Sequence, residues 1–158
     1  MKFKNWKALS CPFLLCLAVS SVEAGSMQST AQVKVNQRKS QEVELIAADE
    51  LKAKIDKNEP VTVLDVRSTD SYIDSDNQIK GAIHVKLRRL KYRLAFPPLK
   101  NVPRNQEVVT YCACPADESS IFAARVLMDA GFNRVRALKG GWQAWHKVRG
   151  AVEPRPKG

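Results

Sequence analysis

The segment that most constrains the fold is the stretch 108–120, VVTYCACPADESS. Its first residues are β-branched and aromatic, which predicts a buried strand. Its last residues are Asp, Glu and two Ser directly before the apolar run 121–130, which is typical of a helix N-terminus. Cys112 and Cys114 lie between the two elements. Because ligands bind at the carboxyl ends of strands in open α/β sheets, this unit predicts a functional site at the loop.

The rest of the chain repeats the alternation of short apolar strands and helices. We expect strands at 44–46, 61–66, 81–85, 108–111 and 135–138. We expect helices at 47–56, 71–73, 86–94, 121–130 and 142–148. Strands that alternate with helices favour parallel pairing, so the predicted fold class is α/β with a parallel sheet.

The N-terminal segment has the pattern of a secretory signal peptide. Three lysines precede the apolar run 8–22, and Val22-Glu23-Ala24 resembles a cleavage site. We therefore expect a signal peptide at 1–24, a polar linker at 25–43, the folded domain at 44–150 and a polar tail at 151–158. An uncleaved anchor is the alternative, although the apolar run is short for a bilayer span. The expected location is outside the cytoplasm, and the periplasm if the source is a bacterium with an outer membrane.

The charge is strongly basic, with a formal net charge of +10. Cleavage after Ala24 removes three lysines and one glutamate, so the excess remains. One basic cluster contains Lys86, Arg88, Arg89, Lys91 and Arg93, and a second contains Arg134, Arg136 and Lys139. Such surfaces attract small anions, acidic partners or an anionic membrane face. We expect no nucleic acid as partner and no stable membrane insertion after cleavage.

The two cysteines that remain after cleavage, Cys112 and Cys114, are too few for a disulfide framework. They are also too close in sequence for an ordinary disulfide, which favours a reactive pair. A helix N-terminus favours the thiolate through its dipole and its unpaired N–H groups. The alternative is that both are small buried apolar side chains. Asp65 is a second anomaly, because a carboxylate that ends a buried strand needs hydrogen-bond partners, and we expect a structural role for it.

Several pieces together resemble the rhodanese-like domain family, in matching order from about residue 44 to 150. They are Val63-Leu64-Asp65-Val66-Arg67, Tyr72, Ile79 to Val85, Val108 to Cys112, Ala130-Gly131-Phe132, Val135 to Trp142, and Trp145. The resemblance implies a five-stranded parallel sheet flanked by helices. It also implies a sulfurtransferase in which a cysteine after the fourth strand carries sulfane sulfur as a persulfide. It implies no cofactor.

The chain departs from the family at the active loop. The usual loop reads Cys-x-x-Gly-x-Arg, whereas Ala, Cys, Pro, Ala, Asp and Glu follow Cys112 here. Strand register makes Cys112 the nucleophile, and the count back from the helix makes it Cys114; we favour Cys112. The loop is therefore expected to be two residues longer than usual.

The predicted site follows from this loop. Catalytic candidates are Cys112 and Cys114. Substrate-binding candidates are Arg67, Ala113, Pro115, Ala116, Asp117, Glu118 and Ser119. The carboxylates of Asp117 and Glu118 should raise the thiol pKa and repel anionic donors, unless Arg67 or the 86–93 cluster compensates. We therefore expect a neutral persulfide, a protein thiol or an oxidised thiol to suit the site at least as well as thiosulfate.

The expected partners are a small sulfur donor and a thiol acceptor, which includes an acidic or thiol-bearing protein. Two other functions stay open: a Cys-x-Cys thiol–disulfide redox protein, and a non-catalytic module that binds a partner. A Cu(I) site on Cys-x-Cys is a weaker alternative. His84 and His146 are isolated in sequence, so we expect structural roles for them and no metal ligation.

Overall fold

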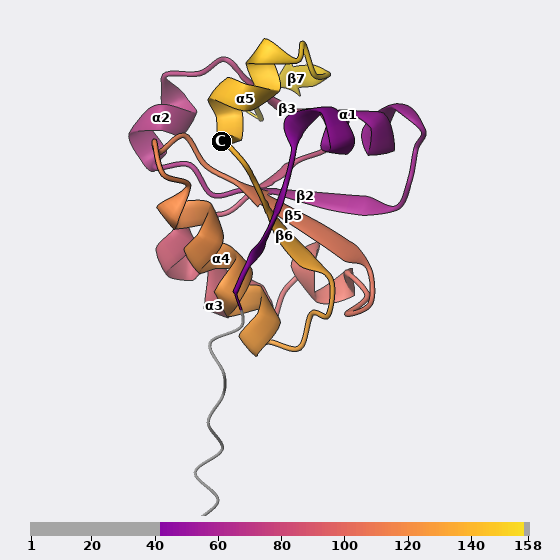
Figure 1. The fold of residues 1–158 in the computed structure, drawn as a ribbon. Helices are drawn as coiled ribbons and strands as arrows, with labels where there is room; N and C mark the ends of the chain where they lie inside the picture. Colours follow the sequence, from indigo (N-terminus) through magenta and orange to yellow (C-terminus); the bar gives the residue numbers. More distant parts are fainter. Residues whose placement is uncertain (1–41, 157–158) are drawn as a thin grey trace, which may run out of the picture. The chain divides into compact units, whose positions relative to one another are not determined.

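The structure, a computed structural model, describes residues 42–156. The predicted signal peptide and most of the predicted linker lie outside the described residues. The main sheet has five strands in the order β1-β6-β5-β2-β4, and every neighbouring pair is parallel (Figure 1). Its strands are β1 (Glu44–Ile46), β2 (Val61–Asp65), β4 (Ile83–His84), β5 (Glu107–Tyr111) and β6 (Val135–Leu138). The expected α/β fold with a five-stranded parallel sheet flanked by helices is confirmed.

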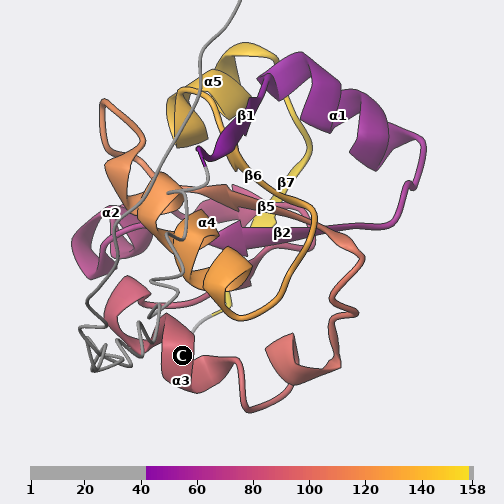
Figure 2. The same ribbon diagram turned by 60° about the horizontal axis from the view of Figure 1, so that its bottom comes forward.

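Helices cover both faces of the sheet and so create two cores (Figure 2). The helices α1 (Ala48–Asp56) and α5 (Gly141–Lys147) pack on one face, where Trp145 is fully buried. The helices α3 (Leu90–Arg93) and α4 (Glu118–Asp129) pack on the other face. Strand β5 is buried along its whole length because it lies between both cores, as its unbroken β-branched sequence predicts.

Strand register brings the chemistry to one edge of the sheet. In the pairing of β2 with β5, Asp65 lies opposite Tyr111, the last residue of β5. In the pairing of β2 with β4, Asp65 lies opposite His84. The loop that holds both cysteines therefore leaves the sheet beside the carboxylate that ends β2.

The basic segment 86–94 is less regular than its leucine spacing predicts. It forms a 3₁₀ turn η1 (Leu87–Arg89), followed by the single-turn helix α3. Leu90 and Leu94 are buried and Leu87 is partly buried, so the predicted apolar face does meet the core. The remaining short elements are the helix α2 (Thr69–Ile73), which the Ser68 hydroxyl caps, and the 3₁₀ turn η2 (Leu99–Asn101).

The C-terminal residues differ from the expected polar tail. Val152–Pro154 form strand β7, which pairs antiparallel with β3 (Asn77–Ile79) in a second, two-stranded sheet. The indole N–H of Trp145 donates to the Ala151 carbonyl at 3.1 Å and anchors this segment to the domain. Both strands are three residues long and carry no alternating apolar pattern, so sequence periodicity gives no sign of them.

The N-terminal boundary of the fold also differs slightly from the expected one. Val43 was assigned to the linker, yet it is buried in the core with α4. Within the described range, no helix has the length and apolar character that a membrane crossing requires.

Candidate functional site

The site is built on the loop that joins β5 to α4. Cys112 follows β5 directly, and its side chain is 1% exposed in the core between the sheet and α4. Its Sγ lies 3.7 Å from the Ser120 hydroxyl in the first turn of α4. Cys114 is partly exposed and packs against the same core, and both cysteines are free thiols.

Burial dominates the acidity of Cys112. Burial, together with the neighbouring Cys114 thiol, raises the pKa of Cys112 to about 11. Interactions with the Cys114 backbone and with Ser120 oppose this shift by favouring the thiolate. The predicted rise in the thiol pKa is therefore present, but its main cause is burial rather than the acidic residues that follow. The N-terminus of α4 does not reverse this rise in the pKa of Cys112.

The turn before α5 holds the active loop in place. The Trp142 N–H donates to the Cys112 carbonyl at 2.8 Å, and the Gln143 side chain donates to the Ala113 carbonyl at 3.3 Å. Gly141 has a φ of +48°, and a Cβ placed there would lie 2.2 Å from the Cys112 carbonyl oxygen. Only glycine therefore allows the two backbones to approach this closely.

Asp117 acts differently from the helix cap that the sequence predicts. It precedes α4 with a left-handed φ of 58° and makes no side-chain capping bond. Its carboxylate instead accepts the Gly140 N–H at 2.8 Å, while the Ser120 hydroxyl donates to the Asp117 carbonyl at 2.8 Å. Asp117 is only 7% exposed, and its second oxygen has no hydrogen-bond partner among the described residues. Asp117 therefore joins the active loop to the turn before α5.

Asp65 has the structural role that its position predicts. Its carboxylate accepts hydrogen bonds from Arg67 Nη2 at 2.7 Å and from the Tyr111 hydroxyl at 2.6 Å. Burial raises the pKa of Asp65, but the nearby His84 imidazole, with Nδ1 3.8 Å away, and the hydrogen bonds from Arg67 and Tyr111 outweigh it and hold the pKa below its ordinary value. The carboxylate thus stays ionised beneath the site.

Arg67 is turned inward rather than toward a ligand. It is 1% exposed, and its guanidinium lies 4.3 Å from the centre of the Trp142 ring. Besides Asp65, Arg67 donates to the Asn77 carbonyl at 3.1 Å. Its charge is therefore paired inside the protein and does not offset the charge of the acidic loop.

The two histidines occupy separate places. His84 stacks on Tyr72 at 3.6 Å between ring centres, and His146 meets the edge of Trp142 at 4.4 Å. Among residues 42–156, no group of three or more His, Cys, Asp or Glu side chains is arranged to hold a metal ion.

A surface groove adjoins the active loop. It has a volume of about 480 Å³ and opens between the segment after β2, the turn η1 and the first turns of α4. Its lining residues are Val66, Arg67, Ser68, Thr69, Lys86, Leu87, Arg88, Ser119 and Phe122. Val66 packs in the same core cluster as Cys112, and Ser119 precedes the serine that contacts the Cys112 sulfur. The groove therefore borders the first turn of α4, next to the serine that contacts the Cys112 sulfur.

The structure separates the predicted site residues into three groups. Arg67, Cys112 and Asp117 are buried, Ala113, Cys114 and Ser119 are partly exposed, and Pro115, Ala116 and Glu118 are exposed. Of the predicted substrate-binding residues, only Arg67 and Ser119 line the groove. Four residues near the site were not among the predicted ones: Ser120, Phe122, Gly141 and Trp142. The Gly140-Gly141-Trp142 segment was a signal, because paired glycines often mark a close approach of two backbones.

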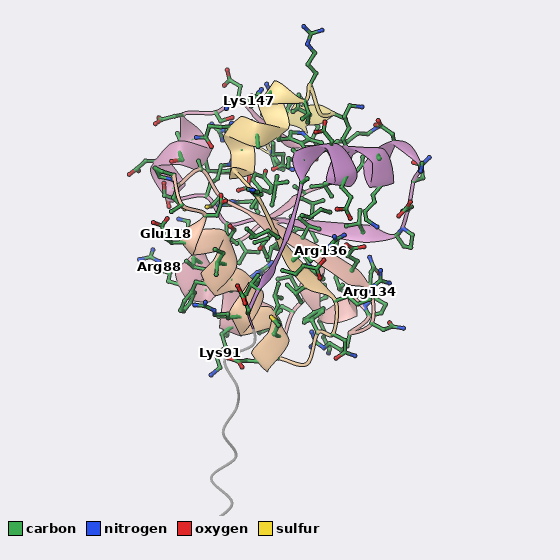
Figure 3. The ribbon with its side chains drawn as sticks, in the orientation of Figure 1. Arg88, Lys91, Glu118, Arg134, Arg136 and Lys147 are labelled. Carbon is green, nitrogen blue, oxygen red and sulfur yellow. The ribbon has the colours of Figure 1, made fainter. Side chains whose placement is uncertain are left out.

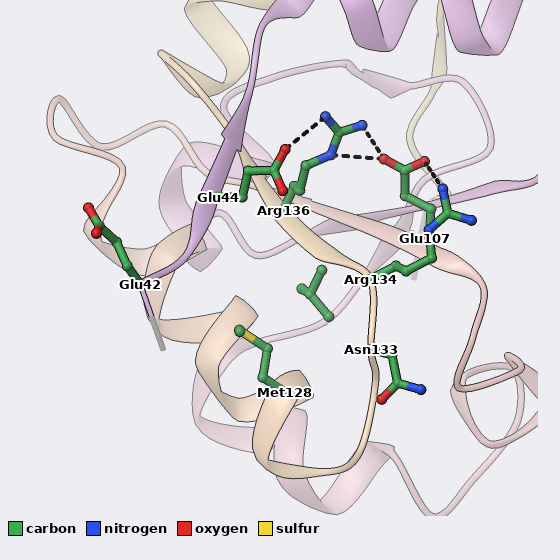
Figure 4. A pocket seen from close by; sticks show the side chains of 8 residues that line it. Glu42, Glu44, Glu107, Met128, Asn133, Arg134 and Arg136 are labelled. Atoms are coloured by element: carbon green, nitrogen blue, oxygen red, sulfur yellow. Dashed lines mark hydrogen bonds and ion pairs between the residues drawn. The ribbon is translucent and has the colours of Figure 1, made fainter. Parts of the chain in front are cut away.

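Arg134 and Arg136 of the second basic cluster lie at the amino ends of β5 and β6, whereas Lys139 follows the carboxyl end of β6. Figure 4 shows Arg136 between Glu44 and Glu107, with Arg134 also turned toward Glu107. Arg136 additionally pairs with Glu50 at 2.7 Å. These residues border a cavity of about 480 Å³, and their charges are largely paired within it.

Comparison with known proteins agrees with this architecture. The sequence profile of the Rhodanese-like domain family matches residues 47–148. YrkF, a candidate sulfur carrier protein of Bacillus subtilis (strain 168), is 28% identical over 100 residues, covering 63% of this chain and 49% of YrkF. The chain thus spans about half the length of that relative.

Solved structures share the fold. The Alr3790 protein of Anabaena sp. is 32% identical with a TM-score of 0.59, covering 69% of this chain and 91% of that chain. The BH2092 protein of Bacillus halodurans is 29% identical with a TM-score of 0.59, and the match covers 72% of this chain and 77% of that chain. The thiosulfate sulfurtransferase of Pseudomonas aeruginosa is 20% identical with a TM-score of 0.58, and the match covers 71% of this chain and 20% of that chain. It shows similarity of fold alone.

Proposed function

The chain belongs to the rhodanese-like domain family, and we propose that it carries sulfane sulfur as a persulfide on Cys112 and passes it to a thiol or another nucleophile. One observation carries this proposal. Cys112 directly follows the central strand β5, and its Sγ lies 3.7 Å from the Ser120 hydroxyl in the first turn of α4. The N–H groups at the start of a helix stabilise a sulfur anion.

The proposed reaction has two balanced steps. The Cys112 thiolate attacks the outer sulfur of a donor persulfide; the S–S bond of the donor breaks, and the donor leaves as a thiolate. An acceptor thiolate then attacks the outer sulfur of the Cys112 persulfide and releases the Cys112 thiolate. Each step exchanges one S–S bond for another, so no external oxidant or reductant is needed.

The loop also supports an inference about the donor. Glu118 is exposed at the start of α4, and the charge of Arg67 is already paired with Asp65. A small dianion such as thiosulfate therefore gains little from the loop itself. An organic persulfide, whose charge lies away from the reacting sulfur, suits this site better.

Intact-mass analysis tests the function. The reduced protein, residues 25–158, is exposed to thiosulfate and separately to a low-molecular-weight persulfide, and the adduct is located by peptide mapping. We expect the mass of one sulfur atom on Cys112 with the persulfide, and retention of this loading in Cys114→Ser. The Cys112→Ser variant is the matched control and should gain no transferable sulfur.

Other outcomes would select the other functions. Loss of two hydrogens without sulfur gain would favour thiol–disulfide exchange between Cys112 and Cys114. No change at either cysteine would favour a partner-binding module. We also propose export with cleavage after Ala24, which N-terminal sequencing of the protein from its native source tests.

A further inference from the structure

The groove over the active loop combines an apolar wall with two cations. Leu87 and Val66 contribute apolar surface, and Phe122 is 54% exposed at its edge. Lys86 and Arg88 line the same groove from the turn η1, and both are exposed. A large exposed aromatic side chain beside a hollow is a common sign of a binding site.

Lys86 and Arg88 have no acidic partners within residues 42–156. Among the described residues, no carboxylate forms an ion pair with Lys86 or Arg88. Arg134 and Arg136, by contrast, are paired with Glu107 at the other edge of the sheet. Figure 3 shows Arg88 at the same end of the molecule as Glu118, away from both of those arginines. Lys86 and Arg88 therefore bring unpaired positive charge to the groove beside the first turn of α4.

We propose that this groove is the binding site for an organic persulfide that carries a carboxylate, and that Lys86 and Arg88 bind the carboxylate. This inference rests on the proposed function, because it names the donor class for the same thiol. The carbon chain of the donor lies against Leu87 and Phe122. The carboxylate lies at the rim, and the persulfide points past Ser119 toward Cys112.

The arrangement explains how a loop with acidic residues can receive an anionic donor. The carboxylate of the donor is held by the cations on η1, on the other side of the groove from α4, which begins at Glu118. The persulfide then needs no cation on the loop, where the family has an arginine and this chain has none.

The test compares an acid with its ester. Sulfur loading of Cys112 is measured against the concentration of glutathione persulfide and of its diethyl ester. We expect Lys86→Ala and Arg88→Ala each to raise the apparent KM for the acid about fivefold to tenfold, as for loss of a partly exposed charged contact. Loading by the ester should be unchanged. Phe122→Ala should raise the apparent KM for both donors.

Lys91→Ala is the matched control, because Lys91 is an exposed cation of the same cluster that does not line the groove. It should leave both donors unaffected. If Lys86→Ala and Arg88→Ala change the apparent KM for the acid and for the ester equally, the groove assignment is wrong. The same holds if they change it no more than Lys91→Ala does. In either case the persulfide function stands. If neither donor loads Cys112 in the unsubstituted protein, the proposed function itself fails.

Discussion

At the scale of single residues, the central feature is a nucleophile candidate that is almost fully enclosed. Burial raises the pKa of Cys112, while Ser120 and the Cys114 backbone supply a few hydrogen bonds that favour the thiolate. At neutral pH the thiol is therefore protonated and weakly nucleophilic in the protein without bound sulfur. A persulfide is a stronger acid than a thiol, so the same hydrogen bonds would suit the loaded form better than the empty one.

The raised pKa predicts a steep pH dependence for alkylation of Cys112. In the Cys114→Ser variant, the reacting thiolate fraction should rise about tenfold per pH unit from pH 7 to pH 10, because this range lies below the pKa of about 11. Iodoacetamide labelling followed by peptide mass analysis measures the rate. Urea-unfolded protein is the control, and its profile should bend near pH 8.5 and level off about one pH unit higher. A bend near pH 8.5 in the folded protein would contradict the assignment.

Gly141 provides a second prediction at this scale. Gly141→Ala would place a Cβ 2.2 Å from the Cys112 carbonyl oxygen, at a φ of +48°. We expect it to lower the free energy of unfolding by about 3 kcal/mol or more, because two backbones must separate. Gly81→Ala is the control: its φ is +76°, but nothing lies within 4 Å of the added Cβ. It should lose only about 1 kcal/mol. Equal losses in urea titrations would show that conformational strain alone matters.

At the scale of elements, the loop between β5 and α4 depends on the turn before α5 for its shape. The Gly140 N–H donates to the Asp117 carboxylate, and the backbone N–H of Trp142 donates to the Cys112 carbonyl. The two segments are far apart in sequence, and β6 lies between them. The geometry around the thiol is therefore a property of two helix N-termini packed together.

This dependence predicts that Asp117→Ala weakens both stability and sulfur loading. Losing the bond to Gly140 should lower the free energy of unfolding by about 1–2 kcal/mol, measured by urea titration. The rate of sulfur loading on Cys112 should fall as well, because the loop is held less firmly. Glu118→Ala, an exposed neighbour, should stay within about 0.5 kcal/mol of the unsubstituted protein. A larger loss in Glu118→Ala than in Asp117→Ala would contradict this role.

At the scale of the whole molecule, the C-terminal segment closes the domain. Strand β7 covers β3, and Arg155 donates from its guanidinium to the Ser75 carbonyl at 3.0 Å. The side chain of Gln78 also donates to Glu153 at 2.9 Å. The segment after Gly150 thus belongs to the folded unit.

Truncation tests this conclusion. A chain that ends after Gly150 should lose about 2–4 kcal/mol of unfolding free energy, since it removes a strand and several hydrogen bonds at once. A chain that ends after Pro156 keeps β7 and should melt at the temperature of the full chain. Equal melting temperatures for the two truncations would show that the segment does not stabilise the domain.

The sequence by itself determined the alternation of strands and helices, the buried central strand and the position of Cys112 at its end. These features depend on local periodicity and on turn residues, which the chain carries residue by residue. The partners of Asp65 were predictable in kind, because a buried carboxylate must be paired. The preference for Cys112 over Cys114 as the expected nucleophile also rests on the strand register.

The tertiary structure alone decided which charges are free and how the thiol is enclosed. Arg136 and Lys86 each belong to a basic cluster in the sequence, yet only Arg136 pairs with Glu107. The reason is that the parallel strands β5 and β6 bring their amino ends together. Asp117 reads as a helix cap but bonds to Gly140, since α5 begins beside the loop. Such pairings join residues from separate elements, so packing fixes them and no local pattern encodes them.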